Sequence, residues 1–563
     1  MTKKLFYLPL LVATIAVVAA CSKLDELTSD YFTVTPQVLE AVGGQVPATI
    51  TGTFPAKYFK KKAVVKITPV LKWDGGEARA ESTTYQGEKV EGNAITVPYT
   101  EGGTYTMKVS FDYVPEMITS ELYLEFDATV GSKAVDLPSI KIADGVISTS
   151  ELVDATVATA SNAEAKDAFQ RIIAEKHEAQ IMFLIQQANV RSSELNTAKD
   201  FEAQVKTINE TDRREITSIE ISAYASPDGS LSLNQGLAEN RQDNTAKVVS
   251  KNLKKDKIEA NVDTKYTAED WEGFQELVAA SNIQDKELIL RVLSMYQDPE
   301  KREEEIKNIS SVYSTLADEI LPQLRRSRLT LNYNVIGKTD EEITAAFASD
   351  PSSLTLEELL YAATLTDDAA QKEKIYKKTA ELYPNDYRAY CNLGVLAYQA
   401  GDYDKAESYL KKAASIESAP EVNLNLGLVA LAQGDTDAAE AYLAKASGAE
   451  GLDEALGNLY IAQGQYAKAV AAFGDTKSNS AALAQILAED YNKAKTTLDA
   501  VSPADGYTYY LKAVIGARTN NSSTVISNLK SAVAADSSLK ARAAADLEFA
   551  AYSDNADFQA IVK

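Results

Sequence analysis

Three patterns of apolar and polar residues follow one another along the chain. Between residues 31 and 150, apolar residues recur at every second position, as in Tyr105, Met107, Val109 and Phe111. Glycine-containing turns such as Glu101-Gly102-Gly103 separate these runs. A period of two belongs to strands with one buried face, and short strands at this spacing are typical of packed antiparallel sheets. We therefore expect an all-β sandwich over residues 31–150.

The second pattern, over residues 176–337, alternates short strands with longer helices. Strands are expected at residues 181–185, 218–223, 258–264 and 329–335, and helices at 192–209, from about 234, and within 271–321. This order predicts an α+β domain with helices on one face of a small mixed sheet. Residues 151–175 and 338–350, which flank the domain, are expected to be linkers.

The third pattern, over residues 351–563, is a helical repeat. Its glycines Gly394, Gly427 and Gly457 recur at intervals of 33 and 30 residues. A small residue follows each glycine after twelve positions and a large one after four more, at Ala406/Leu410, Ala439/Leu443 and Ala469/Phe473. Small residues let paired helices approach, and the large residue fills the space between them. The spacing resembles the tetratricopeptide repeat, which implies an α-helical solenoid with a concave groove for a protein or peptide ligand.

The first twenty residues have the order of an export signal. Lys3 and Lys4 precede an apolar run from Leu5 to Ala20, which ends in small residues directly before Cys21. The run is shorter than the roughly 20 residues of a spanning helix. The Val-Ala-Ala-Cys sequence resembles a lipobox, which implies a signal peptide over residues 1–20 and acylation of Cys21. Residues 21–30 are expected to form a polar lipidated tether that holds the folded part off the membrane.

Composition narrows the possible functions. Without Lys3 and Lys4, the 57 basic residues fall to 55 against 81 acidic residues, a net charge near −26. Nucleic acid is an unfavourable partner for such a chain. Cys391 is the only other cysteine and His177 the only histidine, so the sequence offers no thiolate or imidazole cluster for a metal. With no phosphate-binding glycine loop either, we expect no cofactor, no metal, no catalytic residue and no enzymatic activity.

The most specific motif runs from Ile219 to Ser230 and continues from Asn234 to Arg241. It resembles the OmpA C-terminal family, the peptidoglycan-associating domain of Gram-negative envelopes. There a strand ends in an Asp-bearing Gly-Ser turn, and a helix then begins Asn-x-x-Leu-Ser-x-x-Arg. The matching residues here are Gly229-Ser230, Asn234, Leu237 and Arg241, and Arg325-Arg326 resembles the family's later arginine pair.

The resemblance implies that Arg241 receives a carboxylate of the peptidoglycan stem peptide. A guanidinium suits this role because it forms two parallel charge-assisted hydrogen bonds to a carboxylate. Ser226 stands where the family has an acid, and the nearest carboxylate is Asp228. The candidate peptidoglycan-binding residues are therefore Arg241, Asp228, Ser226 and Asn234. The departure at Ser226 leaves two alternatives, namely that Asp228 reaches the site or that wall binding is weakened or lost.

These features together favour a non-enzymatic lipoprotein of the outer membrane that faces the periplasm. In this hypothesis the lipid binds the membrane, the middle domain binds peptidoglycan and the repeats recruit a protein partner. One alternative is an envelope assembly or secretion adaptor whose OmpA-like domain no longer binds the wall. A second alternative is a surface-displayed binding lipoprotein, for which Asp25 and Glu26 beside the lipid site are the only hint.

Overall fold

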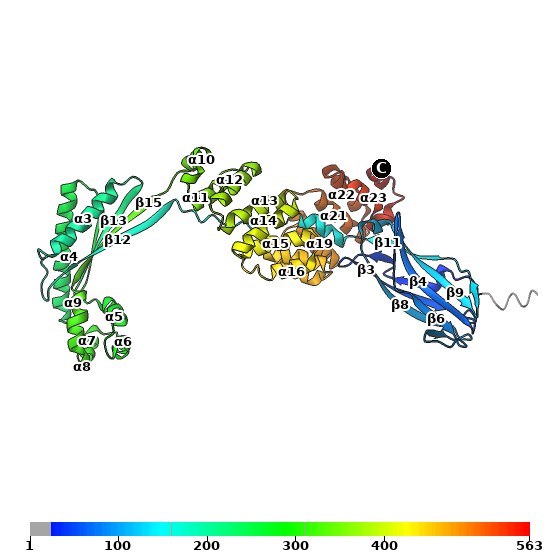
Figure 1. Cartoon of the computed structure of the whole chain (residues 1–563), viewed down its shortest axis with the longest axis horizontal. Helices are drawn as coiled ribbons and strands as arrows, with labels where there is room; N and C mark the ends of the chain where they lie inside the picture. The colour runs from blue at the N-terminus through cyan, green and yellow to red at the C-terminus, as the bar shows by residue number, and fades with distance from the viewer. Residues whose placement is uncertain (1–23, 159, 309) are drawn as a thin grey trace, which may run out of the picture. The chain divides into compact units, whose positions relative to one another are not determined.

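The structure, a computed structural model, describes residues 24–158, 160–308 and 310–563 (Figure 1). The predicted signal peptide and Cys21 lie outside these residues. The chain forms two compact units. The first combines the residues up to Asp167 with Thr366–Lys563, and the second is Ala168–Leu365. The α+β region is therefore inserted into a unit that both ends of the chain build together.

The N-terminal region of the first unit is rich in β-structure, as the alternation predicts. A three-stranded sheet has the order β1-β3-β8, and a larger sheet has the order β2-β11-β9-β4-β6-β7, with β5 and β10 paired at its sides. The strands are β1 (Phe32–Thr35), β2 (Val38–Glu40), β3 (Gln45–Phe54), β4 (Ala63–Trp73), β5 (Gly76–Arg79), β6 (Thr83–Gly87), β7 (Ile95–Val97), β8 (Gly103–Asp112), β9 (Glu121–Val130), β10 (Lys133–Val135) and β11 (Ile140–Ile147). Two strand pairs, β2/β11 and β6/β7, are parallel, which the antiparallel expectation missed.

Both sheets contribute to one apolar core, and the alternation on β8 is realised in it. Met107 and Phe111 are buried, while Lys108 on the same strand is exposed. The core begins earlier than the sequence suggests, because Leu24 and Leu27 are each only 5% exposed within it. Within the predicted tether 21–30, Leu24 and Leu27 are therefore packed against the β-region, and the other described residues of this stretch are exposed.

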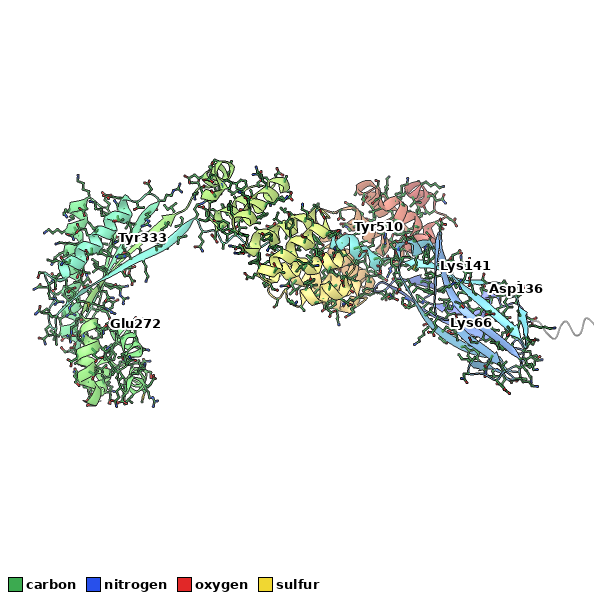
Figure 2. The ribbon with its side chains drawn as sticks, viewed as in Figure 1. Lys66, Asp136, Lys141, Glu272, Tyr333 and Tyr510 are labelled. Atoms are coloured by element: carbon green, nitrogen blue, oxygen red, sulfur yellow. The ribbon has the colours of Figure 1, made fainter. Side chains whose placement is uncertain are left out.

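The second unit contains a four-stranded sheet of order β12-β15-β13-β14. β15 (Arg326–Ile336) pairs antiparallel with both β12 (Ile172–Met182) and β13 (Arg214–Tyr224), and β14 (Val262–Thr267) is parallel to β13. Helices α3 (Glu194–Glu210) and α4 (Leu231–Asp256) pack against this sheet around a common core (Figure 1). Tyr333 on β15 donates a hydrogen bond to Glu175 across the pair (2.6 Å), and its position is labelled in Figure 2.

The two predicted linkers contain regular structure. β12 begins at Ile172, inside the expected linker 151–175. Its first five residues are exposed, so this part of the strand shows no alternation of buried and exposed residues. The expected linker 338–350 holds helix α10 (Asp340–Ser349), which begins with a capping box between Thr339 and Glu342. Together with α11 (Leu356–Thr364), this helix belongs to the second unit.

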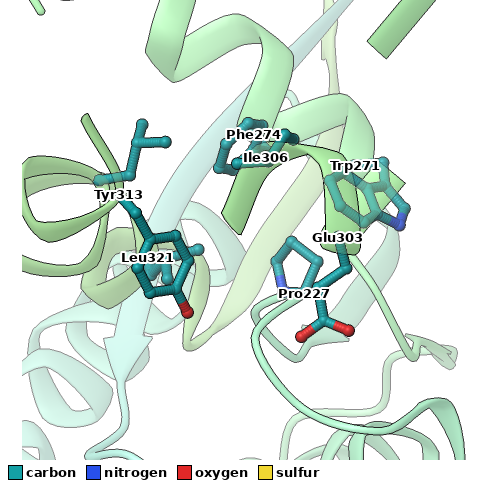
Figure 3. Close-up of a pocket in the computed structure, with 8 residues that line it drawn as sticks. Pro227, Trp271, Phe274, Glu303, Ile306, Tyr313 and Leu321 are labelled. Atoms are coloured by element: carbon teal, nitrogen blue, oxygen red, sulfur yellow. The ribbon is translucent and has the colours of Figure 1, made fainter. Parts of the chain in front are cut away.

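A helical insertion separates β14 from β15. It consists of α5 (Trp271–Ala280), α6 (Lys286–Met295), α7 (Pro299–Asn308), α8 (Ser310–Thr315), the π-helical turn Leu316–Ile320 and α9 (Leu321–Leu324). These helices share an apolar core of their own. Figure 3 shows the residues that line a pocket in this region, among them Pro227 of the β13–α4 turn. The volume of the pocket is about 10 Å³. Because one water needs roughly that much space, the cavity is a packing gap, and it holds no ligand-sized volume.

The rest of the first unit is a stack of paired helices. They are α12 (Ala369–Leu382), α13 (Tyr387–Gln399), α14 (Tyr403–Ile416), α15 (Pro420–Ala432), α16 (Thr436–Leu443), α17 (Leu452–Ala462), α18 (Tyr466–Phe473), α19 (Asn479–Leu487), α20 (Tyr491–Ala500), α21 (Gly506–Arg518), α22 (Ser522–Ala535), α23 (Leu539–Ala545) and α24 (Ala556–Val562). The predicted small and large residues meet within each pair. A Cβ added to Gly394 or Gly427 would lie 2.6 Å from Leu410 or Leu443, and one at Gly457 would lie 2.5 Å from Phe473.

Candidate binding sites

The turn between β13 and α4 carries most of the predicted site. Asn234, which is 3% exposed, donates from its side-chain amide to the carbonyl of Gly229 (2.9 Å). The same asparagine limits the space at Gly229, because a Cβ there would lie 3.1 Å from its Oδ1 atom. Asn234 therefore fixes the shape of the turn, and its amide donor is used within the protein.

Arg241 lies further along α4 and is one of the largest fully buried side chains among the described residues. It is 1% exposed, and its guanidinium stacks over Phe183 at 5.1 Å from the ring centre. It donates from Nε to the carbonyl of Gln187 (2.9 Å), from Nη1 to Tyr224 (2.8 Å) and from Nη2 to Leu184 (3.3 Å). These bonds hold the side chain between the end of β12, the end of β13 and helix α4.

The charge of Arg241 has no direct counter-ion. Among the residues that the structure describes, no carboxylate forms an ion pair with it. Burial lowers the pKa of Arg241 to about 10, and the nearby charge of Arg325 acts in the same direction while Asp228 opposes it. The guanidinium remains a cation at neutral pH, and a buried cation without a partner is costly.

Asp228 and Ser226 are joined to Arg325, which follows the helical insertion. The Arg325 guanidinium donates to Asp228 Oδ2 (2.9 Å) and to the Ser226 hydroxyl (3.2 Å). The Ser226 hydroxyl in turn donates to the other carboxylate oxygen of Asp228. The carboxylate near the site is thus already neutralised by an arginine from elsewhere in the chain.

All four predicted residues nevertheless line one cavity of about 40 Å³. Three of these residues, Ser226, Asp228 and Asn234, come from the turn and the start of α4. Arg241 comes from further along the same helix. The volume fits a carboxylate or a few waters, and it is far below that of pockets that enclose drug-sized ligands. Apolar side chains border it, and two of them, Ile185 (58% exposed) and Leu233 (45% exposed), are open to solvent.

A second buried ion pair lies beside this cluster. Arg326 donates to Asp270 (3.1 Å), with side-chain exposures of 7% and 5%, and Asp270 also accepts from the backbone N–H of Gly273. Burial raises the pKa of Asp270, while Arg326 and the Gly273 bond oppose the shift. The sequence singled out Arg325 and Arg326 through the family resemblance but gave no sign of their acidic partners.

Other reactive side chains have structural surroundings. The Cys391 thiol is fully buried, and burial raises its pKa to about 12. His177 is half-buried on β12 and stacks on Phe201 at 6.2 Å. In the described residues no group of three His, Cys, Asp or Glu side chains is placed to hold a metal ion. None of the described helices is long and apolar enough to cross a membrane.

Residues of the chain itself contact α13, α15 and α17, the first helices of the repeat pairs, and the surface that these helices form is here called the repeat groove. After the short helix α2 (Val153–Val157), residues 160–167, here called the groove segment, run past α17, α15 and α13. Asn425 and Asn392 each bind both backbone groups of one segment residue, Ala163 and Ala165 respectively. The sequence predicted that the repeats bind an external protein or peptide, and in this structure residues 160–167 of the predicted linker 151–175 contact the same helices.

Two family models match part of the helical region. Family models described as tetratricopeptide repeat match residues 375–408 and 397–459. Similar solved structures include a tetratricopeptide repeat protein from Parabacteroides merdae (14% identity, 35% of this chain, 85% of that chain, TM-score 0.29) and PilF from Pseudomonas aeruginosa (16% identity, 40% and 98%, TM-score 0.27). A match to the APC/C hetero-tetramer Cut9-Hcn1 (15% identity, 39% of this chain, TM-score 0.30) spans only 44% of that chain.

A search of curated proteins finds no match to this chain. The repeat assignment therefore rests on the family models and on the glycine-to-large-residue packing of α13–α18. The C-terminal region of this chain contains tetratricopeptide repeats, a module that mediates binding between proteins.

Proposed function

We propose that this protein is a non-enzymatic lipoprotein of the cell envelope that binds a carboxylate-bearing ligand, the peptidoglycan stem peptide, at Arg241. The observation that carries the proposal is a buried guanidinium that lines a cavity without a carboxylate partner. A guanidinium has more N–H groups than the three bonds to carbonyls use, so donors remain for a ligand. A carboxylate in the cavity supplies the missing negative charge.

Two further features support this choice of ligand. The succession β12, α3, β13, α4, β14 and β15 follows the strand and helix order that the OmpA-family resemblance implies. The exposed Ile185 and Leu233 offer an apolar surface beside the charged cavity. A ligand that presents a carboxylate on a short carbon chain complements both.

The membrane part of the proposal rests on the sequence around Cys21. Acylation there places the lipid three residues before Leu24, which is already packed in the β-region. At roughly 3.5 Å per extended residue, the β-region begins within about 10 Å of the lipid attachment point. We therefore propose that the β-region lies directly at the membrane surface, on the periplasmic side of the outer membrane.

The test for the wall ligand is sedimentation of the full chain with purified sacculi. Replacing Arg241 would also leave three carbonyls without donors, so the informative variant is Leu233→Asp, which places a like charge beside the cavity on an exposed side chain. The matched control is Leu195→Asp, on an exposed leucine of α3. We expect sedimentation of the wild type and of Leu195→Asp, and a loss of at least about tenfold for Leu233→Asp. Equal sedimentation of both variants would contradict the assignment.

A second candidate function is an envelope adaptor whose α+β domain no longer binds the wall. The observation that favours it is the Arg325–Asp228 pair (2.9 Å), which neutralises the one acid among the described residues that line the cavity. Under this candidate the wild type stays in the supernatant with sacculi, and partners are recovered through the repeats alone.

A further inference from the structure

The groove segment contacts the repeats at alternate residues. Ser161, Ala163, Ala165 and Asp167 are bound by residues of successive first helices of the repeats. The partners are Glu454 on α17, Asn425 on α15, and Asn392 and Arg388 on α13. Alternate contacts are those of an extended chain, whose backbone groups point to the same side at every second residue.

Most of these contacts are hydrogen bonds to backbone groups of the segment. The backbone N–H of Ala163 donates to Asn425 Oδ1 (3.1 Å), and the amide of Asn425 donates to the carbonyl of Ala163 (2.7 Å). Asn392 repeats the same pair of bonds with Ala165, at 2.8 and 3.0 Å. Arg388 donates to the carbonyl of Asp167 (3.0 Å). Every residue except proline carries both of these backbone groups, so the two asparagines do not select a particular side chain in the bound segment.

The size of the side chains is restricted instead. Ala163 is 6% exposed and Ala165 is 4% exposed, and both belong to the apolar core of the first unit. The neighbouring Asn392 and Asn425 are buried to the same degree. A closely packed interior has no space for a larger side chain at these two positions.

We propose that the repeat groove is a receptor for an extended peptide with small side chains at alternate positions, and that the groove segment occupies it in cis. An external peptide of this kind would form the same bonds to Asn392 and Asn425. It binds only when residues 160–167 leave the groove. The inference does not depend on the wall ligand, because the groove and the Arg241 cavity belong to different units.

The test uses proline, which removes the backbone N–H that each asparagine accepts. The opened protein carries Ala163→Pro and Ala165→Pro in the full chain. The probe is a fluorescently labelled synthetic peptide of residues 156–168, and its matched control is the same peptide with both prolines. Binding is measured by fluorescence anisotropy on the wild type, on the opened protein, and on the opened protein with Asn392→Ala and Asn425→Ala.

We expect the opened protein to bind the probe at least tenfold more tightly than the wild type does. The control peptide and the protein without the two asparagines should not bind. Equal affinity of the wild type and the opened protein for the probe would overturn the occupancy in cis. Failure of a folded opened protein to bind the probe would overturn the role of the groove as a receptor.

A second measurement covers the case in which the opened protein does not fold. Hydrogen exchange on the wild type should show protected amides at Ala163 and Ala165, because both are bonded and buried. Asn392→Ala with Asn425→Ala should speed exchange across residues 160–167 at least tenfold and leave the sheet of the second unit unchanged. Wild-type exchange at the rate of an unstructured chain would overturn the proposal.

Discussion

Two buried side chains, Arg241 and Cys391, differ in what burial does to their charge. Arg241 keeps its positive charge at neutral pH, because its lowered pKa of about 10 is still well above neutrality. Cys391 keeps its proton, because burial raises the pKa of the thiol to about 12. The first therefore remains an attractive group for an anion, whereas the second has almost no thiolate to react.

This difference predicts the reactivity of Cys391. In a Cys21→Ser protein, iodoacetamide near pH 8 should label the folded chain orders of magnitude more slowly than the chain in urea. Slower labelling of the folded chain follows from the raised pKa of the Cys391 thiol, because the reactive thiolate forms only as the pH approaches 12. Labelling of the folded chain at the rate of a free thiol would show that Cys391 is accessible.

At the scale of elements, glycines have opposite roles in the two helical contexts. Gly427 of α15 faces Leu443, and a Cβ there would lie 2.6 Å from it. Gly236 of α4 has no atom within 4 Å of an added Cβ and does not have a positive φ. The repeat glycine is needed for a close approach of helices, whereas the glycine in α4 only weakens its helix.

Alanine at these two positions should therefore shift stability in opposite directions. Gly427→Ala should lower the free energy of unfolding by about 1–3 kcal/mol, because the added methyl group overpacks the helix pair. Gly236→Ala should raise it by about 0.5–1 kcal/mol, since alanine favours the helix. Urea unfolding, followed separately in the two units, measures both changes. A Gly427→Ala protein as stable as the wild type would contradict the packing of the repeats.

The elements that the sequence could predict are those whose signal is local. The β8 alternation and the Gly427–Leu443 spacing each lie within a few tens of residues, and both are realised in the core. The hydrogen-bond partners of the buried polar and charged side chains could not be predicted in this way, because Arg325 and Asp228 lie 97 residues apart and Asn425 and Ala163 lie 262 apart. The strand expected at residues 181–185 shares only two residues with β12 (Ile172–Met182), because the first residues of β12 are exposed and show no period.

At the scale of the whole molecule, the first unit joins the two ends of the chain. Arg518 of α21 is paired with Glu40 of β2 (2.9 Å) and with Glu548 (2.6 Å), and Arg542 of α23 donates to the carbonyl of Ser148 (3.0 Å). The β-region and the repeats therefore form one body through these contacts and through the groove segment. The α+β domain with Arg241 belongs to the second unit, whose residues 168–365 are inserted in the sequence between the two parts of the first.

A pair of matched ligands tests most directly whether the Arg241 cavity recognises a carboxylate. Calorimetric titration of the full chain would compare a muropeptide whose stem diamino acid has a free carboxylate with the same muropeptide amidated at that group. Because a hydrogen bond to a charged group contributes about 1.5–3 kcal/mol, we predict at least about tenfold weaker binding of the amidated form. Equal affinity for the two ligands, or no heat from either, would contradict the account.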